Sequence, residues 1–192
     1  MASTKAARQT ASEADPAAKP QRKRITRRKQ VEQHVRSYFE AIDSRDRAAL
    51  GEHWADDGVL DVVAAGVRRG RAEVEDFFGS MFAAMPDLRT TVSRLVAGEQ
   101  SCAVEWRMDG TFDGSPFMGV DPTDRRVELR GIDLIELDDG RIVSNSVYFD
   151  GGSFARQVGM LPPDGSGADR ALKTAFNTMT KVRRAVAERR RG

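Results

Sequence analysis

RRVELRGIDLIELDDGRIVSNSVYFDGG, residues 125–152, has the pattern of two strands joined by a tight hairpin. Apolar and β-branched residues recur before and after residues 138–140, whose Asp-Asp-Gly sequence is typical of a turn between antiparallel strands. The second strand ends on a carboxylate, Asp150, before a glycine pair. Because side chains alternate along a strand, Ser146 and Tyr148 share a face with Asp150. The stretch therefore predicts an antiparallel sheet with an acid at the end of one strand.

Helices are predicted before this hairpin, and further strands around it. Apolar residues at helical spacing predict helices over residues 26–42, 45–55 and 71–85. Runs rich in β-branched and apolar residues predict strands over residues 59–63, 88–97 and 101–112. A short closing helix is expected at residues 152–160. Strands that follow helices and are joined by hairpins are typical of an α+β fold.

Charge is distributed unevenly along the chain, although the 192 residues carry a formal net charge of only +2. Residues 1–30 have a net charge of +7 and residues 169–192 a net charge of +6, whereas residues 31–168 have a net charge of −11. An acidic body therefore lies between two basic ends. Such ends are typical of solubilising tails, and contact with nucleic acid or an anionic surface is the open alternative.

The composition of the ends also sets the predicted domain boundaries. Residues 1–26 contain almost no apolar side chain larger than alanine, so we expect a disordered basic tail there. Residues 27–161 hold the predicted α+β domain. Residues 162–192 begin as a linker rich in Pro and Gly and continue as a basic helix with apolar residues loosely on one face.

Several classes of protein and site are not expected. No apolar run approaches the ~18 residues of a membrane span, and the N-terminus lacks the apolar segment of a secretory signal. Cys102, the single cysteine, has no partner for an internal disulfide, so we expect a cytoplasmic protein. His34 and His53 lack the spacing of metal ligands, and we interpret His53 beside Trp54 as packing. No metal is expected for this reason, and no cofactor is expected because the sequence lacks a phosphate-binding glycine loop.

Asp133 is the first candidate for chemistry. It is the only polar side chain in the row of alternate residues from Val127 to Leu137. An unpaired buried carboxylate is costly, so Asp133 is expected to be paired or to have a raised pKa. The structural alternative is an Asp that is hydrogen-bonded into the sheet or faces water at a bulge.

Arg107 and Asp109 form a charged row on the strand predicted at residues 101–112. This pattern is typical of the solvated outer face of an antiparallel sheet. The functional alternative places Arg107 between carboxylates, with Asp150 as the third acid. If the strands bring Arg107, Asp133 and Asp150 to one pocket, these groups can act as acid and base without a metal or a nucleotide.

The chain resembles the SnoaL-like polyketide cyclase group of the nuclear transport factor 2-like superfamily over residues 30–161. The most specific segments are GVDPTDRRVELRGIDLIELDDGRIV, residues 119–143, YFD, residues 148–150, and FARQVGML, residues 154–161. The resemblance implies a cone-shaped α+β fold whose curved antiparallel sheet bends around an apolar cavity under the N-terminal helices. It also implies a hydrophobic small molecule as ligand and a homodimer that pairs through the sheet.

The resemblance implies roles for individual residues as well. Asp150 matches the acid/base Asp near the end of the last strand in SnoaL-like cyclases. The polar pair before it, often His-Trp in the family, is Asn145-Ser146 in this sequence. The residues expected to line the substrate pocket are Tyr148, Asn145, Ser146, Leu60, Trp54, Phe78 and Phe82.

Two other functions stay open beside a cyclase- or isomerase-like acid/base enzyme. The limonene epoxide hydrolase group, on the same fold, uses an Arg-x-Asp and a Tyr-Phe-Asp, which match residues 107–109 and 148–150. The Tyr and Asn that position water in that group fall at Leu60 and Val62 here. The second alternative is a non-enzymatic ligand-binding or dimerisation domain, because one fold supports many functions.

Overall fold

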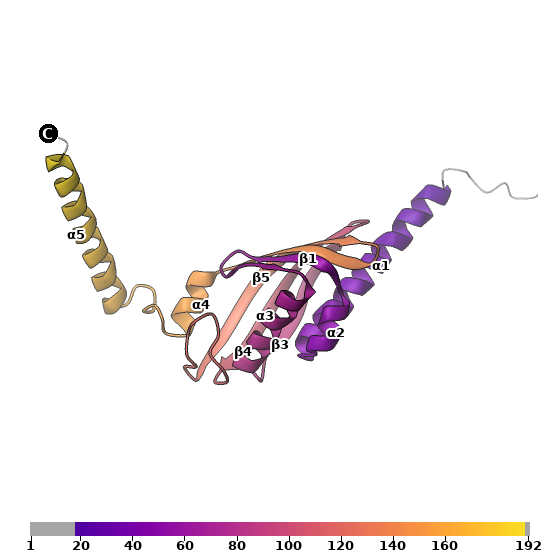
Figure 1. The fold of residues 1–192 in the computed structure, drawn as a ribbon, viewed down its shortest axis with the longest axis horizontal. Helices are drawn as coiled ribbons and strands as arrows, with labels where there is room; N and C mark the ends of the chain where they lie inside the picture. The colour runs from indigo at the N-terminus through magenta and orange to yellow at the C-terminus, as the bar shows by residue number, and fades with distance from the viewer. Residues whose placement is uncertain (1–17, 191–192) are drawn as a thin grey trace, which may run out of the picture.

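Six strands form one curved, open sheet within residues 18–190, the part of the chain that this computed structural model describes (Figure 1). The strand order is β2-β1-β6-β5-β4-β3, and all neighbours are antiparallel except β1 and β6, which are parallel. The strands are β1 (Trp54–Val62), β2 (Gly66–Arg69), β3 (Arg89–Ala97), β4 (Ser101–Phe112), β5 (Arg125–Asp138) and β6 (Arg141–Phe149). The helices are α1 (Ala18–Asp43), α2 (Arg47–Glu52), α3 (Arg71–Ala84), α4 (Gly151–Gln157) and α5 (Gly167–Arg189). The predicted α+β fold is confirmed.

The predicted hairpin at residues 125–149 is confirmed. β5 and β6 pair antiparallel, and Asp138 lies opposite Arg141 beside the turn. Asp139 and Gly140 form the turn with positive φ angles of 43° and 73°. This backbone fits the right-handed twist of the flanking strands, and glycine adopts it without strain.

The core lies between α1, α3 and the face of the sheet that these helices cover, which we call the inner face (Figure 1). Alternate side chains of β5, such as Val127 and Ile135, are buried there. Ile132 and Leu134 project from the opposite, outer face and are 47% and 48% exposed. The outer face is therefore partly apolar as well.

Gly131 makes room in β5 for the indole ring of Trp106, its partner on β4. A Cβ atom at residue 131 would lie 2.4 Å from Cζ2 of Trp106 and 2.5 Å from the backbone oxygen of Tyr148. Any side chain at this position would therefore displace the indole ring or the neighbouring strand. The glycine determines how Trp106 lies over the inner face.

The first helix starts earlier than predicted. α1 already covers residues 18–26, which were expected to be disordered, while residues 1–17 of the predicted tail lie outside the described part of the chain. The Lys, Arg and Gln residues of this extension are good helix formers, so the helix continues beyond the apolar stripe. Arg24 pairs with Glu99 before β4, with an N–O distance of 2.6 Å.

The segment after α1 also differs from the prediction. α2 ends at Glu52, and β1 starts at Trp54 instead of residue 59. The turn predicted at residues 56–58 is a bulge, because the register of β1 against β6 shifts between Trp54 and Val59. β2 was not predicted, because it is short and Val67 is its only residue with an apolar side chain.

Two helices follow the sheet. α4 corresponds to the predicted closing helix, and α5 to the predicted basic helix, which stands away from the domain (Figure 1). Within residues 18–190, no helix has the length and apolar character needed to cross a membrane.

Candidate active site

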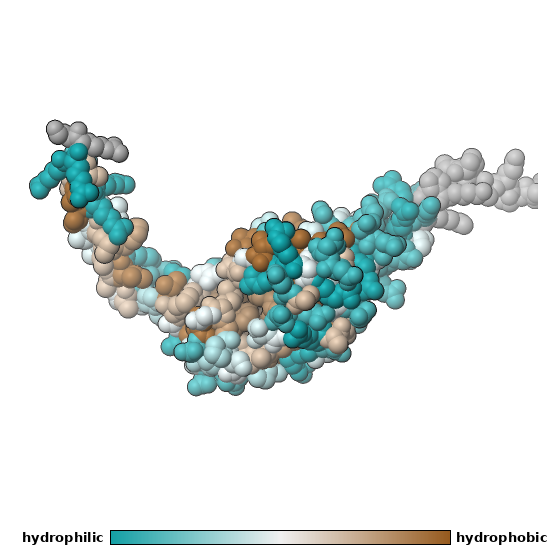
Figure 2. All heavy atoms as spheres, in the orientation of Figure 1, coloured by the Kyte–Doolittle hydropathy of each residue, from teal (hydrophilic) through white to brown (hydrophobic). Residues whose placement is uncertain are grey.

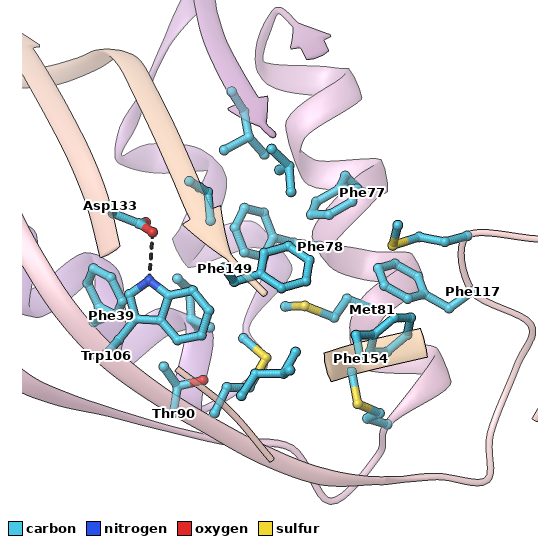
Figure 3. Close-up of a pocket in the computed structure, with 18 residues that line it drawn as sticks. Phe39, Phe77, Phe78, Met81, Thr90, Trp106, Phe117, Asp133, Phe149 and Phe154 are labelled. Carbon is cyan, nitrogen blue, oxygen red and sulfur yellow. Dashed lines mark hydrogen bonds between the residues drawn. The ribbon is translucent and has the colours of Figure 1, made fainter. Parts of the chain in front are cut away.

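An apolar cavity of about 80 Å³ lies between the inner face of the sheet and the helices (Figure 3). Its wall is built mainly from aromatic and methionine side chains, including Phe77, Phe78 and Met81 of α3. Among the described residues that line it, Asp133 is the only ionisable one. A single carboxyl group in an apolar wall is the feature that singles out this cavity.

Two hydrogen bonds hold the carboxyl group of Asp133 at the inner face. The residue lies on β5 and is only 4% exposed. Trp106 Nε1 on β4 donates to Oδ1 at 2.7 Å, as Figure 3 shows, and Asn145 Nδ2 on β6 donates to Oδ2 at 2.8 Å. Because the donors come from both neighbouring strands, the register of three strands determines where the carboxyl group lies.

Burial raises the pKa of Asp133 to about 6, and the hydrogen bonds from Asn145 and Trp106 offset part of this rise by stabilising the carboxylate. A carboxyl group of this kind exchanges its proton near neutral pH, where an ordinary Asp stays ionised. The expectation that Asp133 is paired or has a raised pKa is confirmed, and both conditions hold.

A buried polar layer lies behind Asp133. The side chains of Tyr38, Trp54 and Asn145 are fully buried. The Tyr38 hydroxyl faces the side chains of Asn145 and Trp54. Burial, and then the negative charge of Asp133, raise the pKa of Tyr38 well above its ordinary value, and hydrogen bonding with Asn145 and Trp54 offsets part of this rise, so the phenol stays neutral.

Trp106 and Tyr38 were not predicted as site residues. Trp106 belongs to an apolar row of β4, and Tyr38 to the apolar stripe of α1, so the hydrophobic pattern assigns both to the core. One signal was available, because a buried indole N–H or phenol O–H usually needs a hydrogen-bond partner. An Asp in the apolar row of a neighbouring strand is such an acceptor.

The SnoaL-like polyketide cyclase family model matches residues 32–158 of this chain. The chain belongs to this family. A steroid Delta-isomerase from Nocardioides simplex is 29% identical over 122 residues, which cover 62% of this chain and 89% of the isomerase.

Solved structures have the same fold. A protein from Jannaschia sp. CCS1, assigned to the SnoaL-like polyketide cyclases, has a TM-score of 0.65 at 19% identity, over 79% of this chain and 100% of its own. IdmH from Streptomyces antibioticus, assigned as a polyketide cyclase, has a TM-score of 0.57 at 28% identity, over 67% of this chain and 97% of its own. The nuclear transport factor 2-like fold is confirmed.

Asp150, which matches the family's acid/base position, does not line the apolar cavity. Its exposed side chain caps α4, where Oδ1 accepts a hydrogen bond from the backbone N of Ser153 at 2.9 Å. The catalytic role that the SnoaL-like family implies for Asp150 stays a prediction.

The charged residues of β4 do not line the apolar cavity either. Arg107 is exposed on the outer face, and Asp109 pairs with an arginine of β5. Arg107, Asp109 and Asp150 border a polar surface depression that does not include Asp133. The expectation of one pocket for Asp133, Arg107 and Asp150 is therefore wrong. Strand alternation explains why Arg107 is outside the pocket: Trp106 lies on the inner face, so the next side chain of β4, Arg107, points to the outer face.

Three of the residues expected in the SnoaL-like pocket lie at the cavity or next to it. Leu60 and Phe78 line it, and Asn145 lies behind Asp133. Trp54 and Phe82 are buried in the core, but they do not form the cavity wall.

The other two expected pocket residues lie on the outer face. Tyr148 is 49% exposed, and Ser146 shares its side of β6. The register explains this difference from the prediction, because Val147 lies opposite Asp133 and turns its two neighbours outward.

His34 and His53 lie together, although their sequence spacing did not connect them. His53 Nδ1 and His34 Nε2 are 3.3 Å apart. Burial lowers the pKa of His34, and burial together with His34 lowers the pKa of His53 to about 4. Neither ring lines the cavity, and the described residues contain no group of three His, Cys, Asp or Glu side chains that could hold a metal ion. The pair agrees with the packing interpretation of His53.

Asp133→Asn should raise the free energy of unfolding at neutral pH. Because the folded-state pKa is raised from 3.8 to about 6, the folded protein loses stability as the pH rises through this window, and the loss persists above it. A neutral amide avoids this loss. Its oxygen still accepts from Trp106, and its nitrogen can donate to Asn145 Oδ1 once the Asn145 amide turns over. We expect a gain of about 1–3 kcal/mol at neutral pH and none near pH 4, measured by urea unfolding.

Asp150→Asn is the matched control for this measurement. It makes the same chemical change at an exposed helix cap, where Asn serves about as well as Asp, and should produce no such gain. A stability difference between wild type and Asp133→Asn that is equal at both pH values would contradict a buried, ionised carboxylate.

Proposed function

We propose that this protein is a cofactor-independent acid/base enzyme that moves a proton on a hydrophobic small molecule with a carbonyl group, in an isomerisation or a ring closure. The observation that carries the proposal is Asp133, an acid with a pKa raised to about 6 in an otherwise apolar cavity. Such perturbed groups in pockets are a recurrent feature of acid/base sites. Membership of the SnoaL-like family and the steroid Delta-isomerase relative support the same class of chemistry.

Asp133 is the proposed acid and base in turn. Above pH 6 its carboxylate accepts a proton from the carbon next to the substrate carbonyl, and the electron pair left behind moves onto the carbonyl oxygen as an enolate. Return of the proton to another carbon completes an isomerisation. In a ring closure, the enolate carbon attacks a second carbonyl of the same molecule, and Asp133 gives its proton to the new alkoxide.

The surroundings of Asp133 suit this role. Trp106 and Asn145 each bind one carboxyl oxygen, so the group is held in one orientation before the substrate arrives. The apolar wall keeps water from competing for the proton and strengthens electrostatic interactions inside the cavity.

Thr90 is the proposed hydrogen-bond donor to the enolate oxygen. Its hydroxyl is buried at the cavity wall and has no hydrogen-bond partner among the described residues. Its backbone N donates to Asp43 Oδ1 at 2.7 Å, which holds the residue on β3. Figure 3 shows Thr90 on the same side of the cavity as Trp106. A positioned donor of this kind stabilises negative charge that develops in the transition state.

The size of the cavity limits what enters without rearrangement. At about 80 Å³ it is smaller than the ~150 Å³ of an apolar cavity known to hold benzene. A multi-ring substrate therefore requires side chains of the wall to move. Met81, Met85, Met108 and Met118 all line the cavity, and methionine changes rotamer at low cost.

This narrowness is the observation that favours the second candidate function, a binding or dimerisation domain without turnover. The epoxide hydrolase alternative has less support. It requires Arg107, Asp109 and Asp150 to face a substrate inside the cavity, whereas all three border the outer depression.

Turnover should depend on Asp133. Purified protein would be offered a β,γ-unsaturated ketosteroid, a polyketide-like methyl ester and a small epoxide, with products followed by chromatography and mass spectrometry. We expect conversion of a carbonyl substrate, a kcat/KM that rises with pH through about 6, and a loss of ~10²–10⁴ in Asp133→Asn.

Asp150→Asn separates the candidate acids, because it tests the position implied by the SnoaL-like family with the same chemical change. Loss of turnover in Asp150→Asn, with Asp133→Asn unaffected, would move the acid/base role to Asp150. If wild type binds these substrates and converts none of them, the binding-domain function is the better account.

Thr90→Val should lower kcat by about 10² without lowering the free energy of unfolding, because valine has nearly the same shape as threonine and lacks the buried hydroxyl that has no partner among the described residues. Thr91→Val is the matched control, since Thr91 is exposed on the same strand and does not line the cavity. Equal kcat values for both variants would remove Thr90 from the mechanism.

A further inference from the structure

α5 presents an apolar stripe that no other element within residues 18–190 covers. The helix follows a linker at residues 162–166 and stands away from the domain (Figure 1). Five large apolar side chains recur three or four residues apart and are each between 45% and 69% exposed, namely Leu172, Phe176, Met179, Val182 and Val186. At 3.6 residues per turn they lie on one side of the helix, and we call them the α5 stripe. Figure 2 shows apolar surface along this isolated helix.

The opposite side of α5 is basic. Arg170, Lys181 and Arg184 lie about half a turn away from the α5 stripe at helical periodicity, whereas Arg183 and Arg190 lie beside its C-terminal end. Residues 169–192 carry a net charge of +6. The helix is therefore amphipathic, with a cationic polar face.

Local hydrogen bonds cap the start of this helix, and Asp164 of the linker pairs with both Lys173 of α5 and Arg156 of α4. Ser166 Oγ accepts a hydrogen bond from the backbone N of Asp169 at 3.1 Å, which caps the helix. Asp169 Oδ2 in turn accepts from Lys173 Nζ at 2.7 Å and from the backbone N of Gly165 at 3.0 Å. The apolar stripe is thus presented by a helix that forms before a partner arrives.

The charge of α5 discriminates between partners for the stripe. Pairing with a second copy of α5 would bring together two segments of net charge +6, which repel each other. A nucleic acid would neutralise the basic side and leave the stripe in water. An anionic lipid bilayer satisfies both sides, because apolar residues enter the boundary between headgroups and acyl chains while Lys and Arg reach the phosphates.

We propose that α5 binds this protein to the surface of a membrane that contains anionic phospholipids. The helix lies in the plane of the surface, with the α5 stripe turned toward the acyl chains. The domain body, residues 31–168, has a net charge of −11 and is repelled by the same surface. The linker at residues 162–166 lets the domain keep its distance while the helix is bound.

The test uses the full chain and sedimentation with vesicles. One set contains phosphatidylcholine with about one third phosphatidylglycerol, and the other contains phosphatidylcholine alone. We expect wild type to bind the anionic vesicles at least about tenfold more tightly, with affinity falling as salt is added. Phe176→Gln/Met179→Gln keeps the net charge and should lower this affinity about tenfold or more.

Thr174→Gln/Asn177→Gln is the matched control, since it places two glutamines at the same spacing on the polar side and should bind like wild type. Wild type that stays in solution with anionic vesicles at low salt would overturn the proposal. So would a Phe176→Gln/Met179→Gln variant that binds like wild type, because binding would then need charge alone, as with nucleic acid. An oligomer in vesicle-free buffer that this variant dissociates, without vesicle binding by wild type, would assign the stripe to a second copy.

Discussion

The hydrogen bonds from Trp106 and Asn145 to the buried carboxyl group of Asp133 are the interaction on which the site depends. They join β4, β5 and β6, so the carboxyl group is placed only when all three strands have the correct register. Gly131 belongs to the same arrangement, because a side chain there would occupy the space of the Trp106 indole ring. The fold and the candidate active site are therefore consequences of the same strand pairing.

This arrangement costs the folded protein stability. Burial raises the pKa of Asp133 to about 6, so the folded protein holds an ionised group in an apolar wall at neutral pH. A neutral residue of the same shape would fit the cavity at a lower cost in free energy. Buried ionisable groups that cost stability in this way are commonly functional. Thr90 repeats the pattern on a smaller scale, since its hydroxyl is buried at the same wall without a hydrogen-bond partner among the described residues.

Much of the fold follows from the sequence, and part of the site does as well. Period-two alternation and the Asp-Asp-Gly turn predict the hairpin of β5 and β6, and Asp133 is identified because it is the one polar residue in an apolar row. Alternation shows which residues share a face, but not which face is buried when both carry apolar side chains, as Ile132 and Tyr148 do on the outer face. Because of this ambiguity, Tyr148 and Ser146 were predicted to line the pocket. The hydrogen bond from Trp106 to Asp133 depends on the register between β4 and β5, which local sequence patterns do not determine.

The titration of the Asp133 side chain shows directly whether the cavity encloses its carboxyl group. The ¹³C chemical shift of its carboxyl carbon, assigned by comparison with Asp133→Asn, reports the fraction ionised at each pH. We predict a midpoint near pH 6, because the group is buried in an apolar wall with only two donors. A midpoint at the ordinary Asp value of about 3.8 would mean that water reaches the carboxylate, and would contradict an acid/base site enclosed by the cavity.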